Sequence, residues 1–85
     1  MHLASQNGHA KVAKTLLKWK ANPALKNQYE ETPIHLVAKY DHAHIVPIFA
    51  AAKADLDLKA KDENTALHIA AKLGNIATVL SLIHI

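Results

Sequence analysis

Three histidines recur at a constant interval and divide the chain into repeated units. His2, His35 and His68 are thirty-three residues apart each time. Each stands in a similar apolar phrase, namely Met1–Ala4, Ile34–Val37 and Leu67–Ala70. Because the two full periods, residues 2–34 and 35–67, align without a gap, the chain is an array of one supersecondary unit. The units of such an array bury their apolar faces against their neighbours.

Each unit shows two short segments of helical pattern, followed by a polar and non-periodic connection. The expected helices span residues 2–7, 10–19, 33–40, 43–52, 66–73 and 76–85. Gly8 and Gly74 follow the first helix of their units, where glycine takes the left-handed conformation that ends a helix. Asp41 stands in the same place in the middle unit and tolerates that conformation better than most residues. Pro47 lies near the start of the fourth helix and predicts a distorted first turn there.

The phrase Thr32-Pro33-Ile34-His35 and its counterpart Thr65-Ala66-Leu67-His68, at a period of 33 residues, resemble the ankyrin repeat. The resemblance covers nearly the whole chain. It implies an all-α fold, an ankyrin-repeat solenoid of stacked antiparallel helix pairs joined by β-hairpin or turn loops. We expect a single ankyrin repeat domain over residues 1–85, with repeats at about 1–31, 32–64 and 65–85, the first and last incomplete.

Threonine and histidine in these phrases are expected to shape the backbone. Thr32 and Thr65 are favoured types of N-cap, and Pro33 suits the first position of a helix. In the ankyrin family, the threonine and the histidine lock the turn by hydrogen bonding. The resemblance therefore implies structural roles for the following residues: His2, Thr32, His35, Thr65 and His68.

The chain departs from the family at two turns of the first unit and at the same two turns of the second. Ankyrin hairpins usually carry glycine two residues before the threonine, where Glu30 and Glu63 stand. Glycine also usually ends the second helix, where this chain has Lys20 and Lys53. A non-glycine residue held at positive φ costs about 1 kcal/mol. These substitutions predict a lower stability or locally altered turns.

Composition narrows the class of protein. The net charge is +3, and all of the positively charged side chains are lysines. Arginine is the side chain that contacts phosphate and guanine bidentately, and this chain has none. We therefore expect no nucleic acid partner. No apolar run reaches the length of a membrane span, so we expect no membrane insertion. Residues 1–10 do not have the pattern of a secretory leader, and the chain has no cysteine. Together these features favour an intracellular location, and the cytoplasm in particular.

Seven histidines raise the question of a metal site, above all at His42-Ala43-His44. Helical metal ligands are usually spaced at i, i+3 or i, i+4, and structural zinc sites usually include cysteine. His9 and His42 share one repeat position, where the ankyrin family commonly has histidine. Neither a nucleophile paired with a base nor a phosphate-binding glycine motif is present. We therefore expect no catalytic residue, no metal ligand, no cofactor and no enzymatic activity.

The resemblance places partner binding on the hairpin tips and the exposed side of the first helices, which line a concave groove. The residues of this chain at those positions are Gln28, Tyr29, Glu31, Lys39, Tyr40, Lys61, Asp62, Asn64, Lys72 and Leu73. Tyrosine is enriched in binding hot spots, although Tyr40 could instead shield the neighbouring repeat. Mixed and slightly basic charge gives a mild preference for an acidic or amphipathic protein or peptide. Trp19 is expected on the opposite, convex side or covering apolar surface there.

Both ends of the array carry apolar residues instead of the polar outer faces that terminal repeats need. We expect either a fragment of a longer array or self-association through the uncapped ends. The predicted function is a non-catalytic protein-protein interaction module. The alternative is a structural spacer, or a regulatory segment acting in cis within a larger enzyme or channel.

Overall fold

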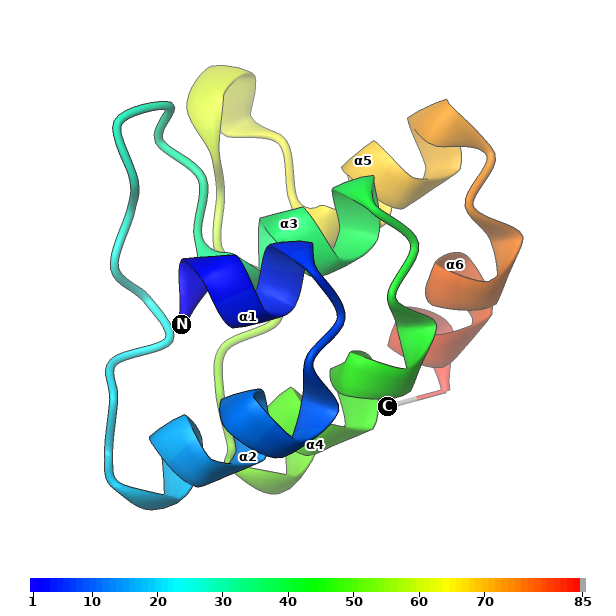
Figure 1. Cartoon of the computed structure of the whole chain (residues 1–85). Helices are drawn as coiled ribbons and strands as arrows, with labels where there is room; N and C mark the ends of the chain where they lie inside the picture. The colour runs from blue at the N-terminus through cyan, green and yellow to red at the C-terminus, as the bar shows by residue number, and fades with distance from the viewer. Residues whose placement is uncertain (85) are drawn as a thin grey trace.

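The computed structural model describes residues 1–84, which form six α-helices arranged as three antiparallel pairs (Figure 1). The pairs are α1 (His2–Gln6) with α2 (Ala10–Lys18), α3 (Pro33–Lys39) with α4 (Val46–Ala51), and α5 (Ala66–Leu73) with α6 (Ile76–Ile83). The predicted all-α fold is confirmed, and the predicted boundaries agree to within a few residues. The end of the last predicted helix, at residue 85, lies outside the described residues.

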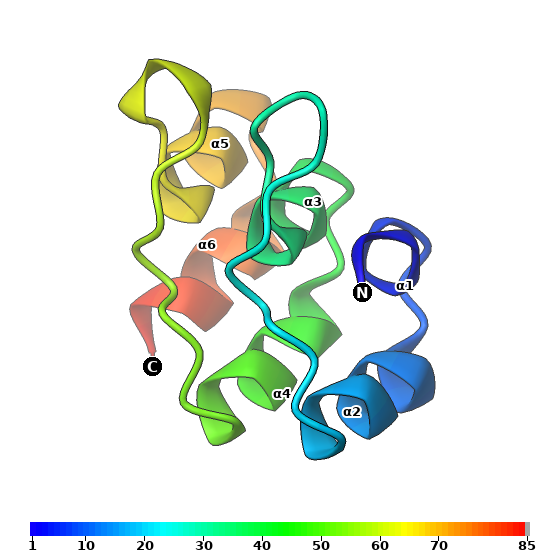
Figure 2. The same ribbon diagram turned by 90° about the vertical axis from the view of Figure 1, so that its left-hand side faces the viewer.

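Three layers build the molecule (Figure 2). Helices α1, α3 and α5 lie side by side in one layer, and α2, α4 and α6 lie beneath them in a second. The connections run along one edge of both layers, and each turns back at a tip beside the first helices. The Asn27 amide donates to the Glu31 carbonyl at 2.9 Å, and the equivalent Ala60 amide donates to the Asn64 carbonyl at 2.7 Å. These tips, residues 27–31 and 60–64, are tight turns, and residues 1–84 contain no β-strand.

Left-handed backbone recurs where the repeat pattern predicts it. Gly8 and Gly74 have φ values of 71° and 74°, and Asp41 takes 58° at the equivalent point of the middle unit. The predicted positions that lack glycine also have positive φ, namely Lys20 at 64°, Glu30 at 61°, Lys53 at 61° and Glu63 at 61°. Asp62, at 62°, adds a left-handed residue that the pattern did not predict. The strain expected from these departures is therefore present in the backbone.

Pro47 distorts the start of α4, as predicted. The segment Ala43–Ile45 forms a single turn of 3-10 helix, and the α-helix begins only at Val46, with the proline in its first turn. A proline there has no amide hydrogen to contribute to the helix ladder. The 3-10 turn connects Asp41 to α4 and does not require a hydrogen bond from the Pro47 nitrogen.

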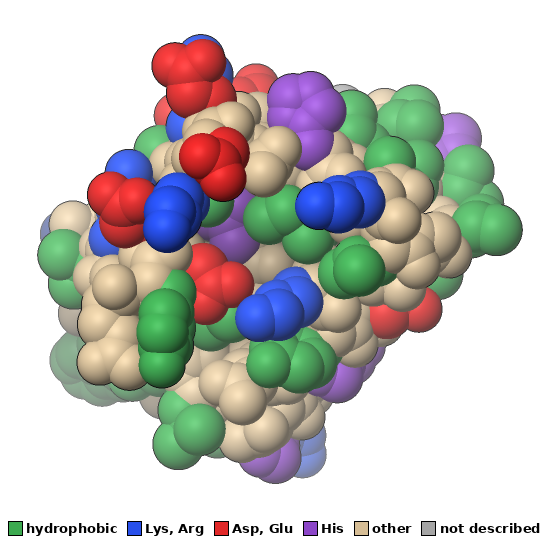
Figure 3. All heavy atoms as spheres, turned by 90° about the horizontal axis from the view of Figure 1, so that it is seen from above, with side chains coloured by type: hydrophobic (Ala, Val, Ile, Leu, Met, Phe, Trp, Pro, Cys, Tyr) green, Lys and Arg blue, Asp and Glu red, His purple; other side chains and the backbone are tan. Residues whose placement is uncertain are grey.

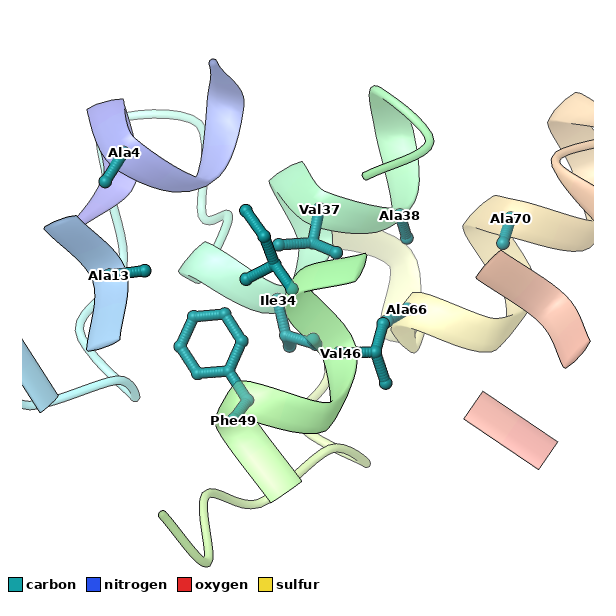
Figure 4. Close-up of a cluster of buried hydrophobic side chains, with 10 residues drawn as sticks. Ala4, Ala13, Ile34, Val37, Ala38, Val46, Phe49, Ala66 and Ala70 are labelled. Atoms are coloured by element: carbon teal, nitrogen blue, oxygen red, sulfur yellow. The ribbon is translucent and has the colours of Figure 1, made fainter. Parts of the chain in front are cut away.

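The core lies between the two helical layers and is centred on the middle unit (Figure 4). Phe49 of α4 is fully buried and points toward α3. All residues of α3 from Pro33 to Ala38 are buried, because this helix has a neighbour on each side. Small residues of the outer units, Ala4, Ala13, Ala66 and Ala70, allow the flanking helices to approach closely.

Trp19 does not cover apolar surface, contrary to one of its two expected roles. The side chain follows α2 and is 79% exposed. The end of a helix at the margin of the array offers a large ring nothing to pack against.

Candidate binding groove

His35 fastens the middle unit to the connection that follows it. The Thr32 amide nitrogen lies 3.0 Å from His35 Nδ1, and the Thr32 hydroxyl oxygen lies 2.7 Å from the same atom. On the other side of the ring, Nε2 lies 2.8 Å from the Leu58 carbonyl and 3.1 Å from the Asn64 carbonyl. One buried ring thus joins the start of α3 to both arms of the second connection.

The partners of His35 fix its protonation state. An amide can only donate, so Nδ1 must accept, and a carbonyl can only accept, so Nε2 must carry the hydrogen. The neutral Nε2–H tautomer satisfies all four contacts. Burial lowers the pKa of His35 below its usual range, although the hydrogen bonds to the Leu58 and Asn64 carbonyls oppose that shift. The network therefore depends on an uncharged ring.

The outer units reproduce parts of this network. His2 Nε2 lies 2.9 Å from the Glu31 carbonyl, which is the counterpart of the Asn64 carbonyl. At the start of α5, the Thr65 amide donates to His68 Nδ1 at 3.1 Å. The contacts of His2 and His35 hold the tips beside α1 and α3, and so define one wall of the groove.

A second set of hydrogen bonds joins adjacent units. His42 Nε2 donates to the Gln6 carbonyl at 2.8 Å, and Asn75, its counterpart one unit later, donates to the Ala38 carbonyl at 2.8 Å. His44 Nε2 donates to the Gly8 carbonyl at 3.0 Å. Each bond satisfies a carbonyl at or just beyond the end of a first helix, a group that the helix itself leaves free.

These contacts bear on the metal hypothesis for His42 and His44. Both rings use Nε2 on backbone carbonyls and pack edge to face, with centroids 5.8 Å apart. Within residues 1–84, no three histidine, aspartate or glutamate side chains gather closely enough to hold a metal ion. Among the helices described, none is both long enough and apolar enough to cross a membrane.

Two adjoining shallow cavities form a groove between the tips and the first helices. Their volumes are about 370 and 230 Å³, and they share Glu31, Lys39, Asn64 and Ile69. Seen from above, lysine and acidic side chains alternate around this region, with hydrophobic side chains between them (Figure 3). The residues that line the two cavities together are Tyr29, Glu31, Lys39, Ala60, Lys61, Asp62, Asn64, Ile69, Lys72 and Leu73.

Charge in the groove is partly compensated. Lys39 Nζ lies 3.7 Å from Glu31 Oε2 and 5.6 Å from the centre of the Tyr40 ring. Within residues 1–84 this is the only ion pair, so Lys61 and Lys72 present ammonium groups that no carboxylate neutralises directly. Ile69 and Leu73 supply apolar surface between the charges.

The structure brings together eight of the ten predicted groove residues and leaves two outside. Gln28 does not line either cavity, and Tyr40 is exposed beside Lys39 instead. Tyr29 lines the larger cavity and is 65% exposed. Ala60 and Ile69 were missed, although their apolar side chains between groove positions in the repeat could have indicated them.

Comparison with known families agrees with this architecture. A family model described as ankyrin repeats, in three copies, matches residues 1–85. The search of curated proteins gave no match.

Proposed function

Because the chain belongs to the ankyrin repeat family, whose repeats are generally protein-interaction modules, we propose that it binds another protein or peptide in the groove and acts without catalysis. The observation that carries this proposal is the continuity of the groove. The two cavities share four lining residues, which come from all three units, so one extended ligand can contact both cavities.

Preorganisation supports binding at this surface. The fully buried ring of His35 holds the second connection against α3 before any ligand arrives. Since the wall and the floor of the groove are already fixed, little conformational entropy is lost when a partner binds. The groove is thus a rigid surface that is suited to binding a partner.

Charge and apolar surface together favour an acidic, amphipathic partner. The uncompensated ammonium groups of Lys61 and Lys72 attract carboxylates, and charge complementarity of this kind speeds encounter and sets register. Apolar side chains of the same partner would contact Ile69 and Leu73. We place this interaction inside the cell, and expect a fluorescently tagged chain to be found in the cytoplasm.

Affinity capture with matched variants tests the proposal. The immobilised chain is exposed to cell lysate beside two variants. Tyr29→Ala removes an aromatic ring from the groove, and Trp19→Ala removes one that follows α2 and lines neither cavity. Both side chains are largely exposed, so both variants should keep the helical circular dichroism of the parent. Truncation of a hot-spot aromatic weakens binding by about tenfold or more.

A protein retained by the parent and by Trp19→Ala, and bound about tenfold more weakly by Tyr29→Ala, supports binding in the groove. Equal retention by all three folded chains would place the interface elsewhere. If the immobilised chain retains no protein specifically, the result would instead favour the alternative, a structural spacer or a regulatory segment acting in cis.

A further inference from the structure

The second helices of the units carry positive charge and no negative charge. Helices α2, α4 and α6 contain no aspartate or glutamate, and the seven acidic residues of the chain lie in the tips and in the other connecting segments. Lys11, Lys14 and Lys18 follow one another at helical spacing on α2, and all three are exposed. In the described part of the chain, residues 1–84, none of these three lysines forms an ion pair. The layer beneath the first helices (Figure 1) is thus a cationic surface.

The middle unit shows which positions of the second helices point away from the array. This unit has a neighbour on both sides, and yet Pro47 and Ala51 of α4 are exposed. The positions one repeat earlier are Lys14 and Lys18, and the position one repeat after Pro47 is Leu80, which is 50% exposed. Because neighbours on both sides do not bury these positions, they face outward in any unit of an array. These five residues define the second-helix face.

Apolar surface lies beside the lysines of the second-helix face. Two adjoining shallow hollows between α2 and α4, with volumes of about 300 and 270 Å³, share Lys14, Ile48 and Ala51. Leu17 adds apolar lining to one hollow, and Pro47 adds it to the other. Ammonium groups next to exposed hydrocarbon are complementary to the interface of an anionic bilayer, where charged headgroups lie above the acyl chains.

We propose that the second-helix face binds the surface of a bilayer that contains anionic lipid. The lysines of α2 contact the headgroups, and the apolar side chains of α4 and α6 lie at the boundary with the acyl chains. The binding is peripheral, and no helix crosses the bilayer.

The width of the second-helix face favours a bilayer over a single protein segment. Packed helices lie about 8–10 Å apart, so the axes of the first and last of three neighbouring helices are roughly 16–20 Å apart. One helical partner, about 10–12 Å across, would cover only part of this face. The groove proposed above lies among the tips and the first helices, so it stays accessible while the second helices contact a membrane.

Co-sedimentation with vesicles tests this proposal. The 85-residue chain is mixed with vesicles of phosphatidylcholine that contain phosphatidylserine, and with vesicles of phosphatidylcholine alone. The parent chain should bind the anionic vesicles, more weakly as the salt concentration rises, and should not bind the neutral ones. A lysine near an anionic surface strengthens binding by about fivefold, so Lys14→Gln/Lys18→Gln should bind the anionic vesicles about 25-fold more weakly.

Two further variants separate the second-helix face from the net charge of the chain. Lys26→Gln/Lys59→Gln removes the same charge from two exposed lysines of the connections and should bind within about threefold of the parent. Ala51→Glu places a carboxylate in the middle of the face and should weaken binding by about fivefold or more. All of the substituted side chains are exposed, so each variant should keep the helical circular dichroism of the parent.

Several outcomes would overturn the proposal. One is a parent chain that does not bind the anionic vesicles, or that binds neutral vesicles equally well. Another is equal weakening by the two double variants, which would mean that only net charge matters, and a third is unimpaired binding by Ala51→Glu. Poly-L-glutamate serves as a soluble probe. If the chain binds this probe through Lys14 and Lys18 but does not bind vesicles, the face binds an acidic protein instead of a membrane.

Discussion

Two equivalent glycines provide a controlled test of the contact between the first and second units. Gly8 and Gly74 occupy the same repeat position and have nearly equal φ values of 71° and 74°. They differ in their surroundings. A Cβ atom at Gly8 would lie 2.7 Å from His42 Nδ1, whereas a Cβ atom at Gly74 would meet nothing within 4 Å. Replacing each by alanine therefore imposes the same backbone strain, with a steric conflict at Gly8 alone.

The expected costs follow from these distances. Left-handed alanine costs about 1 kcal/mol at either position. At Gly8 the His42 ring must also move, which breaks its hydrogen bond to the Gln6 carbonyl and costs about 1 kcal/mol more. Gly8→Ala should thus lower the free energy of unfolding by about 2 kcal/mol, out of a total of roughly 4–13 kcal/mol for a domain of this length. The melting temperature should fall by about 8–16 °C for Gly8→Ala and about 4–8 °C for Gly74→Ala.

Urea unfolding followed by far-ultraviolet circular dichroism measures both costs. A double-mutant cycle isolates the steric part, because in a His42→Ala background Gly8→Ala should cost only the backbone strain, about 1 kcal/mol. Equal costs at the two glycines would refute this reasoning. An unchanged cost of Gly8→Ala after removal of the imidazole would refute it as well.

Two further predictions concern the histidine network and the strained turns. Burial lowers the pKa of His35. When the pH falls below the usual pKa of histidine, the unfolded chain therefore binds more protons than the folded chain. Stability should therefore decrease as the pH falls from about 6.5, and a His35→Gln variant should show a weaker dependence in urea unfolding at pH 7.5 and pH 5. Lys20 has a φ of 64° while Lys14 lies in the middle of α2, and both are exposed. Lys20→Gly should stabilise the chain by about 0.5–1 kcal/mol and Lys14→Gly should destabilise it by about 1 kcal/mol, so shifts of the melting temperature with the same sign would contradict this reasoning.

Local signals made most of the fold predictable. Helix starts at Thr32 and Thr65 and stops at Gly8 and Gly74 depend on the conformation of a few adjacent residues, and these are in the structure as expected. The strained turns were predictable for a similar reason, since the repeat alignment shows which residue stands where glycine is usual. Assignment of the repeats to residues 1–31, 32–64 and 65–85 stays a prediction.

Contacts between units were beyond sequence reasoning. His42 could be recognised as structural, but its acceptor, the Gln6 carbonyl, lies 36 residues away and is defined only by how the units stack. The exposure of Trp19 depends on the absence of packing at one margin, which no local pattern encodes.

The unbroken burial of Pro33–Ala38 in α3 has a consequence for how the molecule opens. Every hydrogen bond between units joins immediate neighbours, so an outer pair can detach while the rest of the array keeps its contacts. The amides of α3 then exchange with solvent only when both neighbours have been lost or the whole chain unfolds. Protection against hydrogen exchange is accordingly graded, highest in the middle of the sequence and falling toward both termini.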